Sequence, residues 1–253
     1  MRITFLGTGT SQGVPVIGCR CHGCTSEDPK DKRLRSSLLI ETGDLVLVID
    51  TGPDFRQQML AAGVTHLDGV LFTHEHRDHI AGLDDIRSFN FIQQAPMDVF
   101  AEGRVLRALQ GGFPYVFAEK KYPGVPQVAV HTISPSPFSI GTLEVIPVRL
   151  MHYRLPVLGF RIGDVAYLTD ANFISEQEKK KLAGVKILIV NALRREKHIS
   201  HFTLSEAVAL IKEIGPGQGY LTHISHQLGR TTEFEKELPE GIQAAYDGLV
   251  LEG

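Results

Sequence analysis

The segment His74-Glu-His76-Arg-Asp78-His79 gathers three histidines and an aspartate within six residues. These side chains offer nitrogen and oxygen ligands and no thiolate, a set that suits Zn²⁺, Mn²⁺ or Fe²⁺. Because residues two apart share a face in extended backbone, His74 and His76 can bind one ion while Asp78 and His79 turn toward a second. The alternative is a turn that carries surface histidines, but the pattern His-x-His-x-Asp-His rarely arises by chance. We therefore predict a site for two divalent cations.

Two cations need further ligands, and three candidates end apolar runs later in the chain. They are His152 in Arg149-Leu-Met-His152, Asp170 in Tyr167-Leu-Thr-Asp170, and His223 in Tyr220-Leu-Thr-His223. Proteins with mixed sheets place chemistry where a strand stops and a loop begins. Taken singly, a histidine or aspartate at a strand end is more often a hydrogen-bonded structural residue. The interpretation of these three residues therefore depends on the histidine motif.

All three cysteines, Cys19, Cys21 and Cys24, lie within six residues. An odd, clustered count favours a metal site over a disulfide framework. Three reduced thiols without a metal, or one disulfide, are the alternatives.

Short β-branched apolar runs predict strands, and segments with helical spacing lie between them. The clearest helix is 203–214, where an apolar stripe follows Thr203 and Glu206, which have the form of a capping box. Because helices and strands do not alternate strictly, we predict a mixed α/β sandwich. The predicted strands are 3–6, 37–41, 45–49, 69–72, 128–133, 143–148, 165–168, 187–190 and 219–222; the predicted helices are 55–62, 102–110, 175–182, 203–214 and 232–238; and 111–126 is predicted as a surface loop.

The composition excludes several classes of protein. With 253 residues, 43% hydrophobic and 22% charged, the chain is typical of a globular protein, predicted as one domain over residues 1–253. Its net charge of −3 and lack of a basic tract argue against a long nucleic acid as partner. No apolar run approaches the roughly 18 residues of a membrane span, and the first residues do not form a signal peptide. We expect a cytoplasmic protein without membrane contact.

The histidine motif followed by a lone histidine, an aspartate and a final histidine resembles the metallo-β-lactamase-fold hydrolases. The resemblance spans the whole chain and implies a four-layer αββα sandwich. It implies that Asp50, in Val48-Ile-Asp50-Thr-Gly52, orients a ligand histidine; a turn aspartate before glycine is the alternative. It also assigns the metal ligands: His74, His76 and His152 to one metal, Asp78, His79 and His223 to the other, and Asp170 as the bridge between them.

The N-terminal segment points to one branch of that fold. Leu6-Gly-Thr-Gly-Thr10, followed by Cys-x-Cys-x2-Cys, resembles the phosphoribosyl cyclic phosphate phosphodiesterases of the PhnP family. In that family three thiolates and one histidine hold a structural zinc, which here implies Cys19, Cys21, Cys24 and His226 on an N-terminal hairpin at about residues 18–26. His22 is a competing fourth ligand.

His201, in Ile199-Ser-His201-Phe-Thr203, matches a histidine that RNase Z and the cyclic phosphodiesterases place in a similar His-x-Thr context. There it donates a proton to the leaving oxygen, a role that suits histidine near neutral pH; an exposed histidine before a helix is the alternative. Asp78 is the second expected catalytic residue. The basic run Arg194, Arg195, Lys197 and His198 either attracts phosphate or forms a solvated surface.

The resemblance implies hydrolysis of a small cyclic phosphate ester, such as 5-phosphoribosyl 1,2-cyclic phosphate or a 2′,3′-cyclic nucleotide, by a metal-bound hydroxide. Two divalent cations (Zn²⁺ or Mn²⁺), a hydroxide and the carboxylates of Asp78 and Asp170 leave a charge of about +1, which suits a phosphodiester monoanion. The alternatives are an RNase Z-like nuclease, a thioester hydrolase, or a non-catalytic PqqB-like zinc protein. A homodimer is common in the resembled family, although no residue argues for one.

Overall fold

The computed structural model describes residues 1–252 and divides into two compact units, each built from segments far apart in the sequence. Unit 1 contains Met1–Gly7, Arg35–Ile133 and the C-terminal segment from Gly248; unit 2 contains Thr8–Leu34 and Ser134–Asp247. Each unit has its own β-sheet and hydrophobic core. The single domain expected from the sequence stays a prediction. Within residues 1–252, no helix is both long and apolar enough to cross a membrane.

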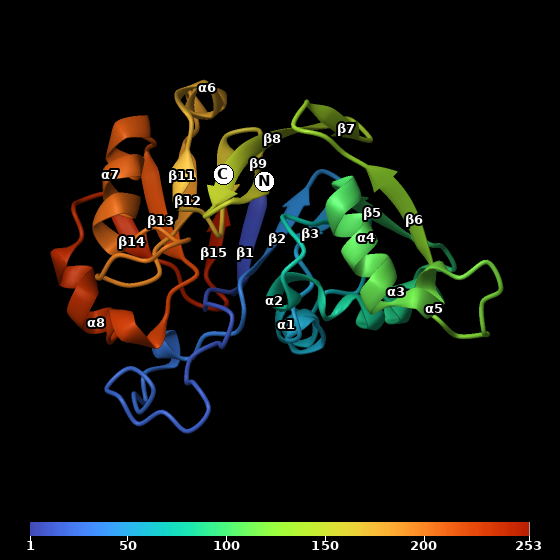
Figure 1. The fold of residues 1–253 in the computed structure, drawn as a ribbon, viewed down its shortest axis with the longest axis horizontal. Coiled ribbons are helices and arrows are strands. Elements are labelled where there is room, and N and C mark those ends of the chain that lie inside the picture. The colour runs from blue at the N-terminus through green and yellow to red at the C-terminus, as the bar shows by residue number, and fades with distance from the viewer. Residues whose placement is uncertain (253) are drawn as a thin grey trace. The chain divides into compact units, whose positions relative to one another are not determined.

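Unit 1 contains a seven-stranded sheet in the order β15-β1-β2-β3-β4-β5-β6 (Figure 1). The pairs from β15 to β3 are antiparallel, and those from β3 to β6 are parallel. Ile49 pairs with Leu71 in the parallel part, so the residues that follow β3 and β4 leave the sheet at the same edge. Asp50 and the histidine motif are those residues. The strands are β1 (Arg2–Gly7), β2 (Ser37–Thr42), β3 (Leu45–Ile49), β4 (Gly69–Leu71), β5 (Met97–Ala101), β6 (Val128–Thr132) and β15 (Val250–Glu252).

Helices of unit 1 bury their apolar faces with the strands. Phe55 of α1 and Phe89 of α3 are buried with their ring centroids 6.5 Å apart, in one core with Val48, Val70 and Val99 of the sheet. The helices are α1 (Phe55–Ala62), α2 (Arg77–Ile80), α3 (Arg87–Gln93), α4 (Gly103–Gly112) and α5 (Pro114–Phe117), with a 3₁₀ turn, η2 (Leu83–Ile86). The predicted loop 111–126 is wrong in its first part, because α4 continues to Gly112 and Pro114 begins α5, a position that proline favours.

Unit 2 contains the second sheet, in the order β11-β8-β9-β10-β12-β13-β14, with β7 paired to β8. The strands β10, β12, β13 and β14 are parallel, and Leu168, Val190 and Leu221 lie in register. Asp170 and His223 therefore follow strands that end at one edge. The strands are β7 (Phe138–Ile140), β8 (Leu143–His152), β9 (Leu155–Ile162), β10 (Val165–Leu168), β11 (Phe173–Ile174), β12 (Ile187–Asn191), β13 (Gln218–Thr222) and β14 (Ile242–Ala244).

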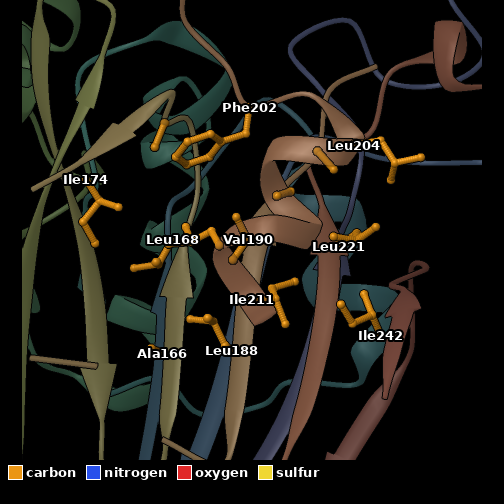
Figure 2. Packing of buried hydrophobic residues seen from close by; sticks show 14 of the residues in the cluster. Ala166, Leu168, Ile174, Leu188, Val190, Phe202, Leu204, Ile211, Leu221 and Ile242 are labelled. Atoms are coloured by element: carbon orange, nitrogen blue, oxygen red, sulfur yellow. The ribbon is translucent and has the colours of Figure 1, made fainter. Parts of the chain in front are cut away.

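The helix α7 (Leu204–Ile214) covers one face of this sheet. Its predicted capping box is present: Thr203 accepts from the Glu206 backbone, and the Glu206 side chain accepts from Thr203 N. Figure 2 shows Ile211 of α7 together with Val190 and Leu221 of the strands beneath it. The other helical segments of unit 2 are short: η1 (Pro29–Asp31), α6 (Glu176–Lys179), η3 (Lys180–Leu182), η4 (His226–Leu228), α8 (Thr231–Phe234) and η5 (Glu235–Glu237).

The cysteine segment is a loop of turns and contains no strands, so the expected hairpin at about 18–26 is wrong. A single antiparallel bridge between Val14 and Arg33 closes the loop at its base. Gly18 takes a left-handed φ of 75° that a β-strand does not allow. The chain turns here so that the three cysteines face one point.

Candidate active site

The histidine motif of unit 1 begins three residues after the end of β4. His74 and His79 are fully buried, whereas His76 is exposed at the start of the short helix α2. The ring centroid of His74 lies 4.6 Å from that of His76 and 4.2 Å from that of His79. His79 Nε2 lies 3.3 Å from a carboxylate oxygen of Asp78. The motif therefore packs its imidazoles and its carboxylate into one small cluster.

Asp50 supports this cluster through hydrogen bonds to Thr73 and His79. It is fully buried, and its carboxylate accepts from the backbone and the hydroxyl of Thr73 at 2.8 and 2.7 Å and from His79 Nδ1 at 2.7 Å. Burial raises the pKa of Asp50, while His79 and the Thr73 donors oppose that rise. Because Nδ1 of His79 donates to the carboxylate, Nε2 keeps the lone pair that a cation needs.

Unit 2 holds a second cluster around Asp170. The Asp170 carboxylate lies 3.2 Å from His223 Nδ1 and 3.8 Å from His201 Nδ1. One ligand atom from each of His152, Asp170 and His201 lies within 4.8 Å of the others. His201 stacks on His223 with ring centroids 4.8 Å apart and meets His152 edge-on at 4.5 Å. Unit 2 thus brings together all of the site residues that the sequence predicted for it outside the cysteine segment.

The second cluster shows the same hydrogen-bonding pattern as the first. His152 Nδ1 donates to the Ser200 carbonyl at 2.9 Å, so its Nε2 is also left as the ligand nitrogen. Metal-binding histidines usually donate their other ring nitrogen in this way, so the residues present fit divalent cations. His201 is buried, and burial together with His223, His152 and His198 lowers its pKa to about 2 against the opposing effect of Asp170. Its imidazole is therefore neutral at pH 7 in the free protein.

Backbone strain concentrates at these residues. Asp50, Asp170 and His223 have φ values of 65°, 54° and 54°, in the left-handed region that side chains other than glycine rarely adopt. Each follows a strand directly or by one residue, and each is at most 2% exposed. Strained conformations of this kind persist where the surrounding structure fixes them, which occurs most often at functional sites.

Sequence reasoning missed three supporting residues. Asn191, at the end of β12, bonds both backbone groups of Ala171, at 2.8 and 3.0 Å, and so fixes the turn that carries Asp170. Thr10 Oγ1 lies 3.1 Å from His223 Nε2, and Thr169 donates to the Asp170 carboxylate at 2.7 Å. One feature of the sequence could have identified Asn191. It is a polar residue at the end of an apolar run, as Asp170 and His223 are.

The cysteine loop forms a third cluster, entirely within unit 2. The ligand atoms of Cys19, Cys21, Cys24 and His226 all lie within 4.8 Å of one another, and His226 Nδ1 is 3.3 and 3.2 Å from the first two sulfurs. His22, the competing ligand, is exposed and lies 3.9 Å from Glu233. The structure therefore places His226, and not His22, beside the three cysteines. Burial raises the pKa of Cys24 to about 11.

Comparison with known proteins decides the family. A family model described as "Beta-lactamase superfamily domain" matches residues 46–224. The chain belongs to this superfamily. A crystal structure described as a new diphosphatase from the PhnP family is 40% identical, with a TM-score of 0.93, and the match covers 100% of this chain and 97% of that one. The predicted resemblance and fold class are confirmed: two mixed sheets with helices form the metallo-β-lactamase fold.

Further proteins resemble the chain in fold or in sequence. Zn²⁺-bound PqqB from Methylobacterium extorquens is 20% identical with a TM-score of 0.79, over 100% of both chains. Human short-form tRNase Z is also 20% identical, with a TM-score of 0.73, over 100% of this chain and 99% of that one. A Porphyromonas gingivalis protein named octanoyltransferase is 45% identical to this chain. The match covers 98% of this chain and 51% of that protein's length. The chain thus corresponds to about half of that relative.

Proposed function

We propose that this protein is a metal-dependent hydrolase of small phosphate esters. The observation that carries the proposal is the matched arrangement of His79 and His152, each of which donates Nδ1 to an oxygen and leaves Nε2 as a ligand. Superfamily membership and the similarity to a PhnP-family diphosphatase support a hydrolytic role.

The proposed ligand assignment follows the superfamily pattern. His74, His76 and His152 would hold one cation, Asp78, His79 and His223 would hold the other, and Asp170 would be shared by both. The nitrogen and oxygen ligands suit Zn²⁺ or Mn²⁺. Such cations, when bound, lower the pKa of coordinated water and polarise a phosphoryl oxygen. All seven proposed ligands are present in the chain, which argues against a non-catalytic, PqqB-like role.

The residues of the chain then have separate tasks. Asp50 and the Ser200 carbonyl orient two ligand imidazoles, and Asn191 holds the Asp170 turn. His201 is the proposed proton donor to the leaving oxygen. Burial lowers the pKa of His201, and the negative charge of a bound phosphate diester would stabilise its imidazolium form.

The preferred substrate is a small cyclic phosphate diester, either 5-phosphoribosyl 1,2-cyclic phosphate or a 2′,3′-cyclic nucleotide. Because the PhnP-family relative is described as a diphosphatase, a diphosphate ester belongs to the same proposal. The P. gingivalis relative named octanoyltransferase favours a second candidate, hydrolysis of an acyl thioester, since cations held by the same ligands would polarise a thioester carbonyl.

The cysteine loop is proposed to hold a structural zinc through Cys19, Cys21, Cys24 and His226. Three thiolates and one imidazole form a closed tetrahedral set, and the ion would tie residues 19–24 to residue 226 of the same unit.

A substrate panel tests the proposal. Protein loaded with Zn²⁺ or Mn²⁺ is assayed with bis-p-nitrophenyl phosphate, 2′,3′-cyclic AMP, 5-phosphoribosyl 1,2-cyclic phosphate, a dinucleoside diphosphate and octanoyl thioester. We expect hydrolysis of phosphate esters that is lost in His79→Ala and kept in His66→Ala, a matched change at an exposed histidine of unit 1. Activity confined to the thioester would reject the phosphate proposal and leave the second candidate.

A further inference from the structure

Three exposed apolar side chains of unit 2 belong to residues that lie, along the chain, within three residues of a member of the histidine cluster. Tyr153, Phe173 and Ile199 are 48%, 55% and 62% exposed. They belong to three segments that Asn172 fastens together: Asn172 Oδ1 accepts from Tyr153 N at 2.8 Å, and its Nδ2 donates to the Ile199 carbonyl at 3.0 Å. Phe173 is the next residue in the chain. We call Tyr153, Phe173 and Ile199 the apolar shelf.

The residues of the apolar shelf adjoin His152 and His201 along the chain. Tyr153 directly follows His152, and Ile199 precedes Ser200, whose carbonyl accepts from His152 Nδ1. His201 follows Ser200, and its ring packs 4.5 Å from that of His152. A substrate whose phosphate reaches His152 and His201 would therefore place its neighbouring group beside the shelf.

Tyr153 is held in place at some energetic cost. Its φ of 58° lies in the left-handed region, which tyrosine rarely adopts, and the bond to Asn172 holds it there. The guanidinium of Arg154 lies 5.2 Å from the centroid of the Tyr153 ring, within cation–π distance. An exposed aromatic ring backed by a cation is suited to stacking on a flat, electron-rich group.

We infer that the apolar shelf binds the planar base of a nucleotide substrate, with Tyr153 stacked on the base; this rests on the proposed phosphate-ester hydrolysis. An acyl chain fits less well, because apolar ligands of that kind bury most of their surface in enclosed pockets, whereas these side chains lie open. Stacking of a base on one aromatic side chain contributes enough affinity to change a dissociation constant about tenfold.

The test separates the ring from the backbone. Tyr153→Asn removes the ring but keeps a residue that tolerates a left-handed φ, and Tyr153→Phe keeps the ring. Phe91→Ala, an exposed aromatic in α3 of unit 1, is the matched control. Each metal-loaded variant is assayed on 2′,3′-cyclic AMP and on 5-phosphoribosyl 1,2-cyclic phosphate, which has no base, and AMP binding is measured by calorimetry.

For Tyr153→Asn we expect KM for 2′,3′-cyclic AMP and Kd for AMP to rise about tenfold, with kcat nearly unchanged and the base-free substrate unaffected. Tyr153→Phe and Phe91→Ala should behave as the parent protein. Equal effects on both substrates, unchanged AMP binding in Tyr153→Asn, or an effect only on an acyl thioester would overturn the inference. If no phosphate ester is hydrolysed while AMP binding still depends on the ring, the proposed function fails and the base site stands.

Discussion

At the scale of single residues, the site depends on side chains that bind no metal themselves. Asp50 fixes the tautomer and orientation of His79, Ser200 does the same for His152 through its carbonyl, and Asn191 fixes the turn before Ala171. The proposed ligands could be predicted from the sequence because each belongs to a motif or follows an apolar run. The Thr10–His223 contact joins residues that are 213 apart in the chain, so no local sequence pattern predicts it.

Replacing Asp50 with asparagine tests this support. The amide can still accept one hydrogen bond, but its NH2 group meets donors of Thr73 and His79, so the orientation of His79 is lost. We expect Asp50→Asn to weaken binding of the active-site cation about 10- to 100-fold, measured by titration against a metal chelator. Asp68→Asn changes a similar Asp–His pair at an exposed place in unit 1 and should leave metal affinity intact. Equal affinity in Asp50→Asn and the parent protein would contradict the assigned role.

At the scale of elements, a helix or strand is predicted correctly where its own residues carry the capping and apolar patterns that define it. The helix predicted over 203–214 is α7 (Leu204–Ile214), with its cap at Thr203 as predicted. β9 escaped prediction because Pro156 and Gly159 interrupt its apolar run. Gly159 is required by packing: a Cβ there would lie 2.6 Å from a Leu168 side-chain atom and 2.7 Å from the Tyr167 carbonyl oxygen. The close approach of the neighbouring strand β10 therefore requires glycine at residue 159, and this contact cannot be predicted from the sequence.

The cap of α7 also positions His201, which lies two residues before Thr203. Thr203→Ala should lower the free energy of unfolding by about 1 kcal/mol and, by loosening the start of the helix, reduce kcat for the phosphate substrate. Ser175→Ala removes a comparable cap from α6. That variant should show a similar loss in urea denaturation with unchanged kcat. A kcat effect of the same size in both variants would mean that the cap acts only through general stability.

At the scale of the whole molecule, buried charges join distant segments of unit 2. Arg33 donates to Thr8, Thr231 and the Ala245 carbonyl, and Asp247 accepts from Thr8 and from Leu34 N. Nothing in the sequence marks Arg33 as buried or Asp247 as part of its network. Their partners lie up to 239 residues away, so this network, like the cysteine loop that it anchors, emerges only in the folded chain.

Asp247 gives this network a pH dependence. Burial raises the pKa of its carboxyl from 3.8 to about 6, against its hydrogen bonds and Arg33. The folded state therefore holds the proton more tightly than the unfolded state, and stability falls as pH rises from about 4 to about 6. Relative to Asp247→Asn, the parent protein should lose up to about 3 kcal/mol of unfolding free energy between pH 4 and pH 7, measured by urea denaturation. A difference that does not vary with pH would show that Asp247 stays ionised throughout.

We propose that seven histidine and aspartate side chains hold a pair of cations, separate from a zinc in the cysteine loop. Elemental analysis of purified, metal-loaded protein tests it most directly, with Asp170→Ala and Cys21→Ser measured beside the parent. The account predicts about three metals per chain in the parent, about one in Asp170→Ala and about two in Cys21→Ser. A single metal in the parent protein, or a metal content that Asp170→Ala leaves unchanged, would contradict it.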